Sequence, residues 1–409
     1  MAGRQQRRGP LAGMRVLELA QIMAGPTAGM MLADMGADVV KVEKLPGGDD
    51  SRDYNEPRVN GVSAPFLMLN RNKRGIALNL KLAKGRDVLL RMVRDADVLT
   101  ENYRKGTLDK LGLGYDVLRR ENPGLIYCAV SGYGREGPYA DKGGFDLIAQ
   151  GFAGLMSITG EPGGPPVKTG NSVADINAGI LAVVGILAAY AHKVRTGEGQ
   201  IVETSLMEAA LQQTYWHAAM HFATGESPGP TGSAHILTAP YQAFRASDGW
   251  INIGGANQSN WERICDVLGH PEWREDPRFR TNRDRMANLE ALAAAMNHVI
   301  ATRTKSAWME AFDRAGVPAG PVHTIGQALA HPQTLARGMV VDLVHPEAGA
   351  TKAIGCPVHF SQTPASVTRP APMLGEHTRE VLRSYDYADA EIDELVAEGV
   401  IAESSAVPR

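Results

Sequence analysis

The sequence of 409 residues has few cysteines, few aromatic side chains and almost no net charge. Its three cysteines, Cys128, Cys265 and Cys356, lie far apart and form no CxxC pair, which excludes a disulfide framework and a zinc knuckle. A formal net charge of −3 gives no electrostatic reason to expect a nucleic acid or a membrane surface as a partner. We therefore expect a cytoplasmic protein whose cysteines are reduced.

Several functional motifs are also missing. The basic residues at the N-terminus are followed by no apolar stretch, so we expect no secretory signal. No GxxxxGK[ST] loop is present, which excludes a P-loop nucleotide site. His217 and His221 have the spacing of two zinc ligands on a helix, but no third ligand accompanies them and we expect no metal. The segment 132–137 matches GxGxxG, but Pro138 follows it in place of a helix, which argues against a dinucleotide site.

The first two hundred residues alternate short apolar runs with amphipathic segments. We predict buried strands at 15–19, 39–43, 77–80, 97–100 and 125–130, and helices at 25–35 and 85–96. This alternation predicts an α/β fold, in which a parallel sheet carries helices on both faces. Ligands bind beyond the carboxyl ends of such strands, so the candidate binding loops are 20–26, 43–52 and 101–110.

The length of the chain and its content of 44% hydrophobic and 21% charged residues predict two soluble domains. Residues 224–239 are rich in Gly, Pro and Ser, which is typical of a crossing between domains. A hairpin at 241–253 and three later helices predict a smaller α+β domain. We predict domain bounds at 1–223, 224–330 and 331–409, with a last helix at 377–385.

Asp175 is the most informative residue of the chain. It stands before a helix, predicted over 176–191, that is apolar on nearly every face and is therefore expected to be a buried core helix and not a membrane span. The amides and the dipole of its first turn would keep the Asp175 carboxylate ionised while water is partly excluded, as a carboxylate nucleophile requires. The alternative is that Asp175 only caps the helix.

Eight segments, spread in order over nearly the whole chain, resemble the class III CoA-transferases, the CaiB/BaiF group that includes formyl-CoA transferase. They are 11–19, 24–26, 32–43, 72–74, 101–112, 197–200, 316–321 and 371–379. The resemblance implies a Rossmann-like large domain built from both chain ends, so that 331–409 returns to it, and an inserted small domain. It also implies a homodimer of interlocked chains.

The resemblance assigns roles to individual residues. Asp175 would be the nucleophile and would carry an aspartyl-CoA thioester, and the loop of Gly254 and Gly255 would close over this intermediate. Coenzyme A would be a substrate, and no permanently bound cofactor is expected. The positions that match the CoA-binding residues of the family are Ile22, Ala24, Lys44, Leu78, Lys81, Asn102, Tyr103 and Lys110.

Three positions depart from characterised patterns of the family and bear on the substrate. Met23 and Tyr54 stand where formyl-CoA transferase has Gln and Trp, which argues against formyl-CoA and oxalate. The related α-methylacyl-CoA racemases have His-Asp where this chain has Phe145-Asp146, and Phe145 cannot exchange a proton. We expect a CoA-transferase that uses succinyl-CoA or a similar donor and a small organic acid. The alternatives are a racemase-like enzyme and a non-catalytic CoA-binding protein.

Overall fold

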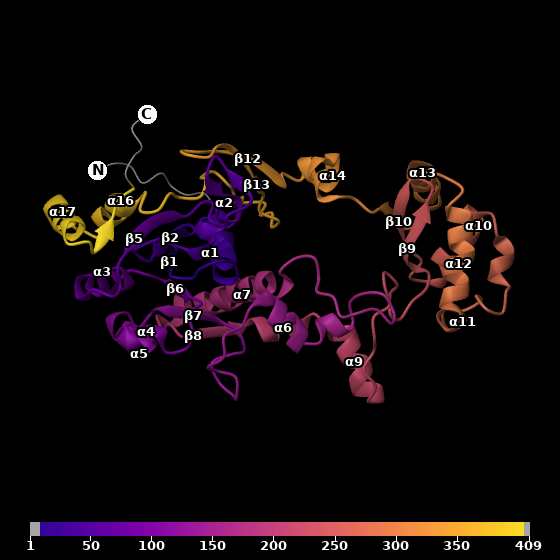
Figure 1. The fold of residues 1–409 in the computed structure, drawn as a ribbon, viewed down its shortest axis with the longest axis horizontal. Helices are drawn as coiled ribbons and strands as arrows, with labels where there is room; N and C mark the ends of the chain where they lie inside the picture. The colour runs from indigo at the N-terminus through magenta and orange to yellow at the C-terminus, as the bar shows by residue number, and fades with distance from the viewer. Residues whose placement is uncertain (1–8, 405–409) are drawn as a thin grey trace. The chain divides into compact units, whose positions relative to one another are not determined.

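The fold is centred on a seven-stranded sheet with the strand order β14-β5-β2-β1-β6-β7-β8 (Figure 1). The structure is a computed structural model that describes residues 9–404, so the basic segment 1–8 of the sequence lies outside the described residues. Neighbouring strands are parallel except for β14, which pairs antiparallel with β5. The predicted α/β class with a mainly parallel sheet is confirmed. The strands are β1 Arg15–Glu18, β2 Asp38–Glu43, β5 Arg74–Leu78, β6 Val98–Glu101, β7 Ile126–Ser131, β8 Ile201–Ser205 and β14 Ile401–Ala402.

Helices cover both faces of this sheet because side chains alternate between the faces along each strand. On one face, strand residues such as Val40 and Ile76 pack with α3, α5, α16 and α17 into a buried core. The long helix α7 packs with α1 and α8 and against β7 and β8. The helices of this part are α1 Ala24–Asp34, α2 Ala64–Leu69, α3 Ala83–Val93, α4 Thr107–Lys110, α5 Tyr115–Glu121, α6 Asp146–Phe152, α7 Val173–Thr196, α8 Leu206–Gln212, α16 Thr378–Arg383 and α17 Asp389–Ala397. Helix α9 Tyr215–Thr224 follows α8 and belongs, from Trp216 on, to a second compact unit.

The chain divides into two compact units. The first contains residues up to Leu155, the segment Thr169–Tyr215 and the chain from Pro332 onward, and the second contains Met156–Lys168 and Trp216–His331. The division therefore falls a few residues before the predicted bound at 223/224 and close to the bound at 330/331. A short segment before α7, which the sequence analysis placed in the first domain, belongs to the second unit.

The second unit has its own sheet and core. Strands β9 Tyr241–Ala246 and β10 Gly249–Gly254 form the predicted antiparallel hairpin, and β11 Ala319–Pro321 pairs with β10. Large apolar side chains, including Trp261, Trp308 and Phe312, are completely buried between this sheet and the helices. The helices are α10 Gln258–Leu268, α11 Asn282–Ala287, α12 Leu289–Ile300, α13 Lys305–Ala315 and α14 Ile325–Ala330, with a short 3-10 turn at Pro271–Arg274.

The helix after Asp175 is longer and less buried than predicted. Apolar side chains on the face of α7 that turns away from α1 and the sheet are exposed, and Val184 is 59% exposed. The expectation of burial on nearly every face was therefore wrong for the single chain. Among residues 9–404, α7 is also the one helix long and apolar enough to cross a membrane, which is a weak indication because core helices of soluble proteins meet the same criteria.

The C-terminal part holds two elements that the sequence analysis missed. The predicted last helix is α16, but α17 follows it, and β14 then joins the edge of the main sheet. Before them, β12 Val340–His345 and β13 Gly349–Ile354 form an antiparallel hairpin. The remaining short elements are the pair β3 Arg58–Val59 and β4 Val62–Ser63, the 3-10 turns Asp50–Asp53 (η1) and Leu155–Ser157, and α15 Pro332–Ala336.

Candidate active site

Asp175 lies in the first turn of α7 but does not cap it. The helix begins at Val173, its N-cap residue is Ser172, and no side chain of the cap residue bonds to the first turn. Asp175 is the third helical residue, so the reading of Asp175 as a simple N-cap is wrong. Among the described residues, its carboxylate has no hydrogen-bond donor and no cation within salt-bridge distance.

A second carboxylate, that of Asp146, performs the capping. Its Oδ1 accepts a hydrogen bond of 2.9 Å from the Ala174 amide in the first turn of α7. Its Oδ2 accepts one of 2.7 Å from Nε2 of Gln150, whose own Oε1 accepts from the Thr169 amide at 2.9 Å. These bonds fix Asp146 at the start of α6 against the start of α7. Two acids from two helices therefore share one corner of the site.

This arrangement raises the pKa of Asp175 to about 6, because burial penalises the charged form and the nearby Asp146 charge repels it. The helix dipole was predicted to favour the ionised form of Asp175, whereas burial and the Asp146 charge shift its pKa in the opposite direction. With this pKa, roughly nine-tenths of the protein carries an ionised Asp175 at pH 7. Asp175 is therefore a carboxylate that is both charged and poorly solvated, the state that makes an oxygen nucleophile reactive.

The crossing of α1 and α7 places Asp175 close to the start of α1. A Cβ on Gly179 would lie 2.6 Å from the Ala24 carbonyl oxygen and 2.7 Å from Cβ of Thr27, so only glycine lets the helices approach this closely. Asp175 precedes Gly179 by one helical turn on nearly the same face. The N-cap residue of α1, Met23, makes no side-chain cap bond, which leaves the amides of this first turn to other acceptors.

Tyr54, which follows the turn η1, also belongs to this corner. Its side chain is partly exposed. Its pKa is raised by burial and by the negative charges of Asp49, Asp175 and Asp50, which means that its hydroxyl lies within electrostatic reach of the Asp175 carboxylate. The phenol is a neutral hydrogen-bond donor at the mouth of the site.

The sheet brings most of the predicted CoA-binding positions to one edge. Because β5, β2, β1 and β6 are parallel neighbours, the loops after their carboxyl ends meet there. Ile22 and Ala24 follow β1, Lys44 follows β2, and Asn102 and Tyr103 follow β6. The amide group of Asn102 fastens two of these loops together, accepting from the Gln21 N–H and donating to the Gln21 carbonyl, both at 2.8 Å.

The other predicted CoA-binding residues differ in accessibility. Lys81 and Lys110 are exposed, and Lys44 is exposed and paired with Asp50. Tyr103 is half-buried, and its hydroxyl faces the side chain of Gln21. Leu78 is completely buried in the core, so the expectation that its side chain packs near the nucleotide was wrong. Its apolar character reflects the interior of the sheet.

Gly254 and Gly255 belong to the second unit, where β10 ends. Their amides already donate to the carbonyl oxygens of Pro318, at 2.8 Å, and Pro240, at 2.7 Å. A Cβ on Gly255 would lie 2.8 Å from that same Pro240 oxygen, so close packing explains the glycine. In this conformation neither amide is free to donate to a substrate, and the catalytic role of this loop stays a prediction.

Other candidate groups do not form a site. Among residues 9–404, no cluster of three or more His, Cys, Asp or Glu side chains could hold a metal ion. Residues 225–229 match GxSxG, but they follow helix α9 instead of a strand, and Ser227 Oγ lies 3.4 Å from His221 Nδ1 with both residues exposed.

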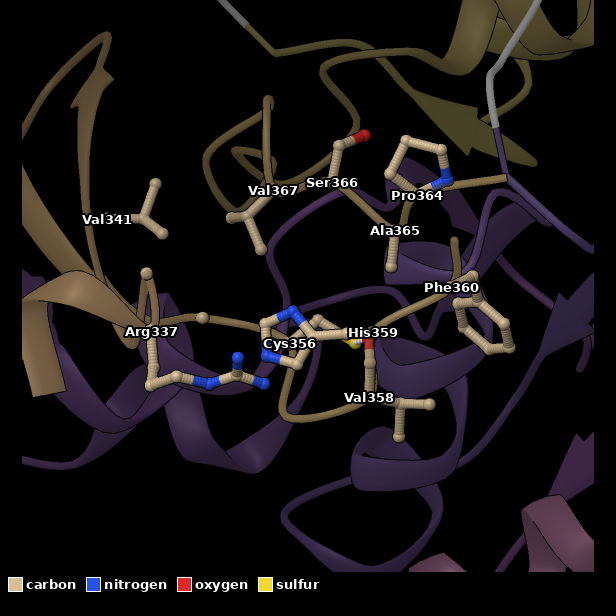
Figure 2. Close-up of a pocket in the computed structure, with 12 residues that line it drawn as sticks. Arg337, Val341, Cys356, Val358, His359, Phe360, Pro364, Ala365, Ser366 and Val367 are labelled. Carbon is tan, nitrogen blue, oxygen red and sulfur yellow. Dashed lines mark hydrogen bonds between the residues drawn. The ribbon is translucent and has the colours of Figure 1, made fainter. Parts of the chain in front are cut away.

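Figure 2 shows a pocket lined by residues that lie between Arg337 and Val367 in the sequence, including Cys356 and His359, and by none of the predicted site residues. Burial raises the pKa of the Cys356 thiol, so this sulfur is not an activated nucleophile.

The structure adds two buried acids that the sequence analysis did not single out. Asp49 bonds to the loop of Ile22, and Glu101 Oε2 accepts a 2.8 Å hydrogen bond from the Tyr103 amide. Both lie in or beside loops marked as candidates, after β2 and at the end of β6. In the sequence, only their position in these loops pointed to a role at the site. An acid in a loop is ordinarily solvated, so residue type gave no further indication.

Comparisons with known proteins agree with this geometry. The sequence profile of CoA-transferase family III matches residues 11–378. The chain is 41% identical over 392 residues to a succinate–glutarate CoA-transferase from Agrobacterium fabrum, covering 93% of this chain and 97% of that protein. It is 36% identical over 394 residues to a succinyl-CoA:glutarate CoA-transferase from Homo sapiens, covering 96% of this chain and 90% of that protein.

A solved structure leads to the same family. The crystal structure of a CaiB/BaiF family protein from Brucella suis matches with a TM-score of 0.83 and 38% identity, covering 93% of this chain and 100% of that one. Family III proteins transfer CoA between carboxylic acids. The chain therefore belongs to CoA-transferase family III and is a CoA-transferase.

Proposed function

We propose that Asp175 is the nucleophile through which this enzyme transfers CoA. The observation that carries the proposal is a half-buried carboxylate that has no cation and no hydrogen-bond donor among residues 9–404, beside the loops that follow the parallel strands. A structural acid in such a place would be expected to have a partner. An unpaired one gains its partner from the substrate.

The reaction proceeds in four balanced steps. The Asp175 oxygen attacks the carbonyl carbon of the acyl-CoA, forming a mixed anhydride and releasing the CoA thiolate. The thiolate attacks the aspartyl carbonyl, which releases the donor acid as a carboxylate and leaves aspartyl-CoA thioester. The acceptor carboxylate then attacks this thioester to form a second anhydride and thiolate. Attack of the thiolate on the acceptor's carbonyl gives the new acyl-CoA and regenerates the Asp175 carboxylate.

The residues around Asp175 divide the remaining work. The uncapped amide N–H groups of the first turn of α1 are suited to donate hydrogen bonds to an anionic group of CoA or to a developing oxyanion. Lys44, Lys81 and Lys110 lie at or near the same edge and suit the phosphates. Tyr54 is placed to donate a hydrogen bond to the acyl or carboxylate oxygen of the substrate.

The substrate pair that we propose is succinyl-CoA with a small dicarboxylic acid such as glutarate. The support is the identity, at 41% and 36% over nearly the whole chain, with proteins named for succinate or succinyl-CoA and glutarate. A racemase is less well supported, because Phe145, at the N-cap of α6 beside Asp146, is apolar and 73% exposed and offers no second proton-transfer group.

We further propose an interlocked homodimer, as the family resemblance implies. In the first unit, α6 and α7 expose apolar side chains, among them Ile148, Phe152 and Val184. In the second unit, Phe222 on α9 is 85% exposed. Large apolar side chains exposed in this way are the kind of surface that a partner chain buries. Light scattering should give twice the mass of one chain, and a monomer at micromolar concentration would contradict this assembly.

The nucleophile is tested by trapping. The enzyme is incubated with succinyl-CoA and hydroxylamine and then digested for mass spectrometry. An anhydride or thioester on Asp175 becomes a hydroxamate, so the peptide that contains Asp175 should gain this group only when an acyl-CoA is present. Asp116 is an exposed acid in the first turn of α5, so Asp116→Asn is the control variant and its Asp175 peptide should be labelled normally. The Asp175→Asn variant should not be labelled. Turnover of succinyl-CoA and acid without any labelled peptide would show that the proposal is wrong.

A further inference from the structure

The turn between β1 and α1 contains a strained residue. Ile22 has a φ of 68°, a left-handed conformation that β-branched side chains rarely adopt. Among residues 9–404, three other non-glycine residues have positive φ, namely Asn60, Asn72 and Asp386, which are residue types that tolerate it. Ile22 therefore needs an interaction from outside its own chain segment to hold it there.

Asp49 supplies that interaction from the loop after β2. Its Oδ1 and Oδ2 lie 3.1 and 3.2 Å from the Ile22 amide nitrogen, so the N–H is shared between both oxygens of the carboxylate. The same carboxylate accepts from the Ser51 amide at 2.9 Å and the Ser51 hydroxyl at 2.7 Å. Its side chain is completely buried, so no water competes for these bonds.

A buried lysine keeps Asp49 ionised. Lys41 Nζ lies 2.8 Å from Asp49 Oδ2, 3.1 Å from Glu18 Oε1 and 3.0 Å from the Ala20 carbonyl oxygen. Burial alone would raise the pKa of Asp49, but the charge and hydrogen bond of Lys41 outweigh it and lower the pKa to about 2. The bond from the Ile22 amide to Asp49 is therefore charge-assisted at neutral pH.

We propose that Asp49 is a positioning residue for acyl-CoA, which holds the Ile22 amide so that the turn of Gln21, Ile22 and Met23 presents the uncapped first turn of α1 to the substrate. Asn102 holds Gln21 from the other side through two hydrogen bonds. The inference rests on the proposed role of this turn in CoA binding. The alternative is that Asp49 serves only as the charge partner of Lys41.

The first test measures the backbone of Ile22 alone. At an ordinary position glycine is less stabilising than alanine, but at a positive φ the order is reversed. Ile22→Gly should therefore melt about 1–3 °C above Ile22→Ala, although both lack the side chain. The exposed Asp386, with a φ of 60°, provides the control, since Asp386→Gly should also melt above Asp386→Ala without affecting CoA. If Ile22→Ala melts as high as Ile22→Gly, the strain does not exist and the inference fails.

The second test measures CoA binding by calorimetry in a double-mutant cycle. Asp49→Asn should weaken binding of CoA about tenfold in the wild-type background, because the charge-assisted bond to Ile22 is lost. In the Ile22→Gly background the same change should cost less than about threefold, because glycine adopts the turn without help. In kinetics, the KM for succinyl-CoA should rise with Asp49→Asn while the KM for the acceptor acid stays unchanged.

The outcomes separate the alternatives. Equal losses of CoA affinity in both backgrounds would show that Asp49 acts only through Lys41 and would overturn the inference, while the proposed CoA site would stand. If the wild type itself failed to bind CoA, the proposed site and the inference would both be wrong. If Asp49→Asn does not fold, CoA binding is compared between Ile22→Gly and Ile22→Ala. The inference is overturned if Ile22→Ala binds CoA at least as tightly as Ile22→Gly does.

Discussion

Replacing the proposed nucleophile should make the protein more stable. The pKa of Asp175 is raised to about 6 by burial and by Asp146, from an ordinary value of 3.8. For an acid with a raised pKa, the folded state holds its proton more tightly than the unfolded chain does. Stability is therefore lost as pH rises from about 4 to 6, and the loss is complete above pH 6. Asp175→Asn has nearly the same shape but carries no charge, so it avoids that loss.

The magnitude follows from the shift. Roughly two pKa units correspond to at most ~3 kcal/mol, and contact of the site with solvent reduces this to about 1–2 kcal/mol. We expect Asp175→Asn to melt about 2 °C or more above the wild type at pH 7.5. The two proteins should melt together near pH 4, where Asp175 is protonated in the folded wild type. CoA transfer should be abolished at every pH.

The assay is thermal denaturation of both proteins by calorimetry between pH 4 and 8, with turnover measured in parallel. The matched control is Asp116→Asn, which removes an exposed acid from the first turn of α5 and should change neither quantity. A variant that melts below the wild type at pH 7.5 would refute the reasoning. So would a gain in stability that is the same at all pH values, since ionisation of Asp175 would then not be its cause.

Three further predictions concern the same site. Asp146→Asn should lower the midpoint of the acid limb of kcat/KM from about 6 by less than one unit, because burial is the larger cause of the shift; an unmoved midpoint would contradict this. Gly179→Ala should lower the free energy of unfolding by about 1–3 kcal/mol in thermal denaturation, because the new Cβ meets the Ala24 carbonyl. Gly326→Ala, in open space on α14, is the control and should raise the free energy of unfolding by about 0.5–1 kcal/mol. Lys81→Ala combined with Lys110→Ala should raise the KM for acyl-CoA several-fold, more at low salt than at high salt, and an equal rise for the acceptor acid would rule out phosphate pairing.

The main sheet could be predicted because its strands are short apolar runs that are buried on both faces. Val39–Val42, interrupted only by Lys41, and Ile126–Val130 show this pattern plainly, and both lie in strands of the sheet. The elements that were missed have weaker signals. In α17 only Ile392 and Leu395 are buried among charged residues, and β14 contains two residues.

The site could be predicted only where one residue carries the chemistry. Asp175 stands out because an acid opens an apolar helix. Its neighbour Asp146 does not stand out, because it bonds to a residue 28 positions away in the sequence and local patterns do not reveal such contacts. Asp49 is 27 positions from Ile22, whose β-branched side chain would by itself predict an extended backbone. Leu78 shows the opposite error, since its match to a binding position concealed an ordinary core residue.

Because β14 pairs with β5, one edge of the main sheet is completed only when the end of the chain has been made. Strands β1, β2, β5, β6, β7 and β8 lie within the first 205 residues, whereas β14 is made about two hundred residues after β8. Until then, the part of the β5 edge that β14 pairs, at Ala77 and Leu78, is open to any other nascent strand. A chain that stalls or is cut before Ile401 should keep its sheet but lose this protection. Its solubility in the cell should therefore fall more sharply than its content of secondary structure.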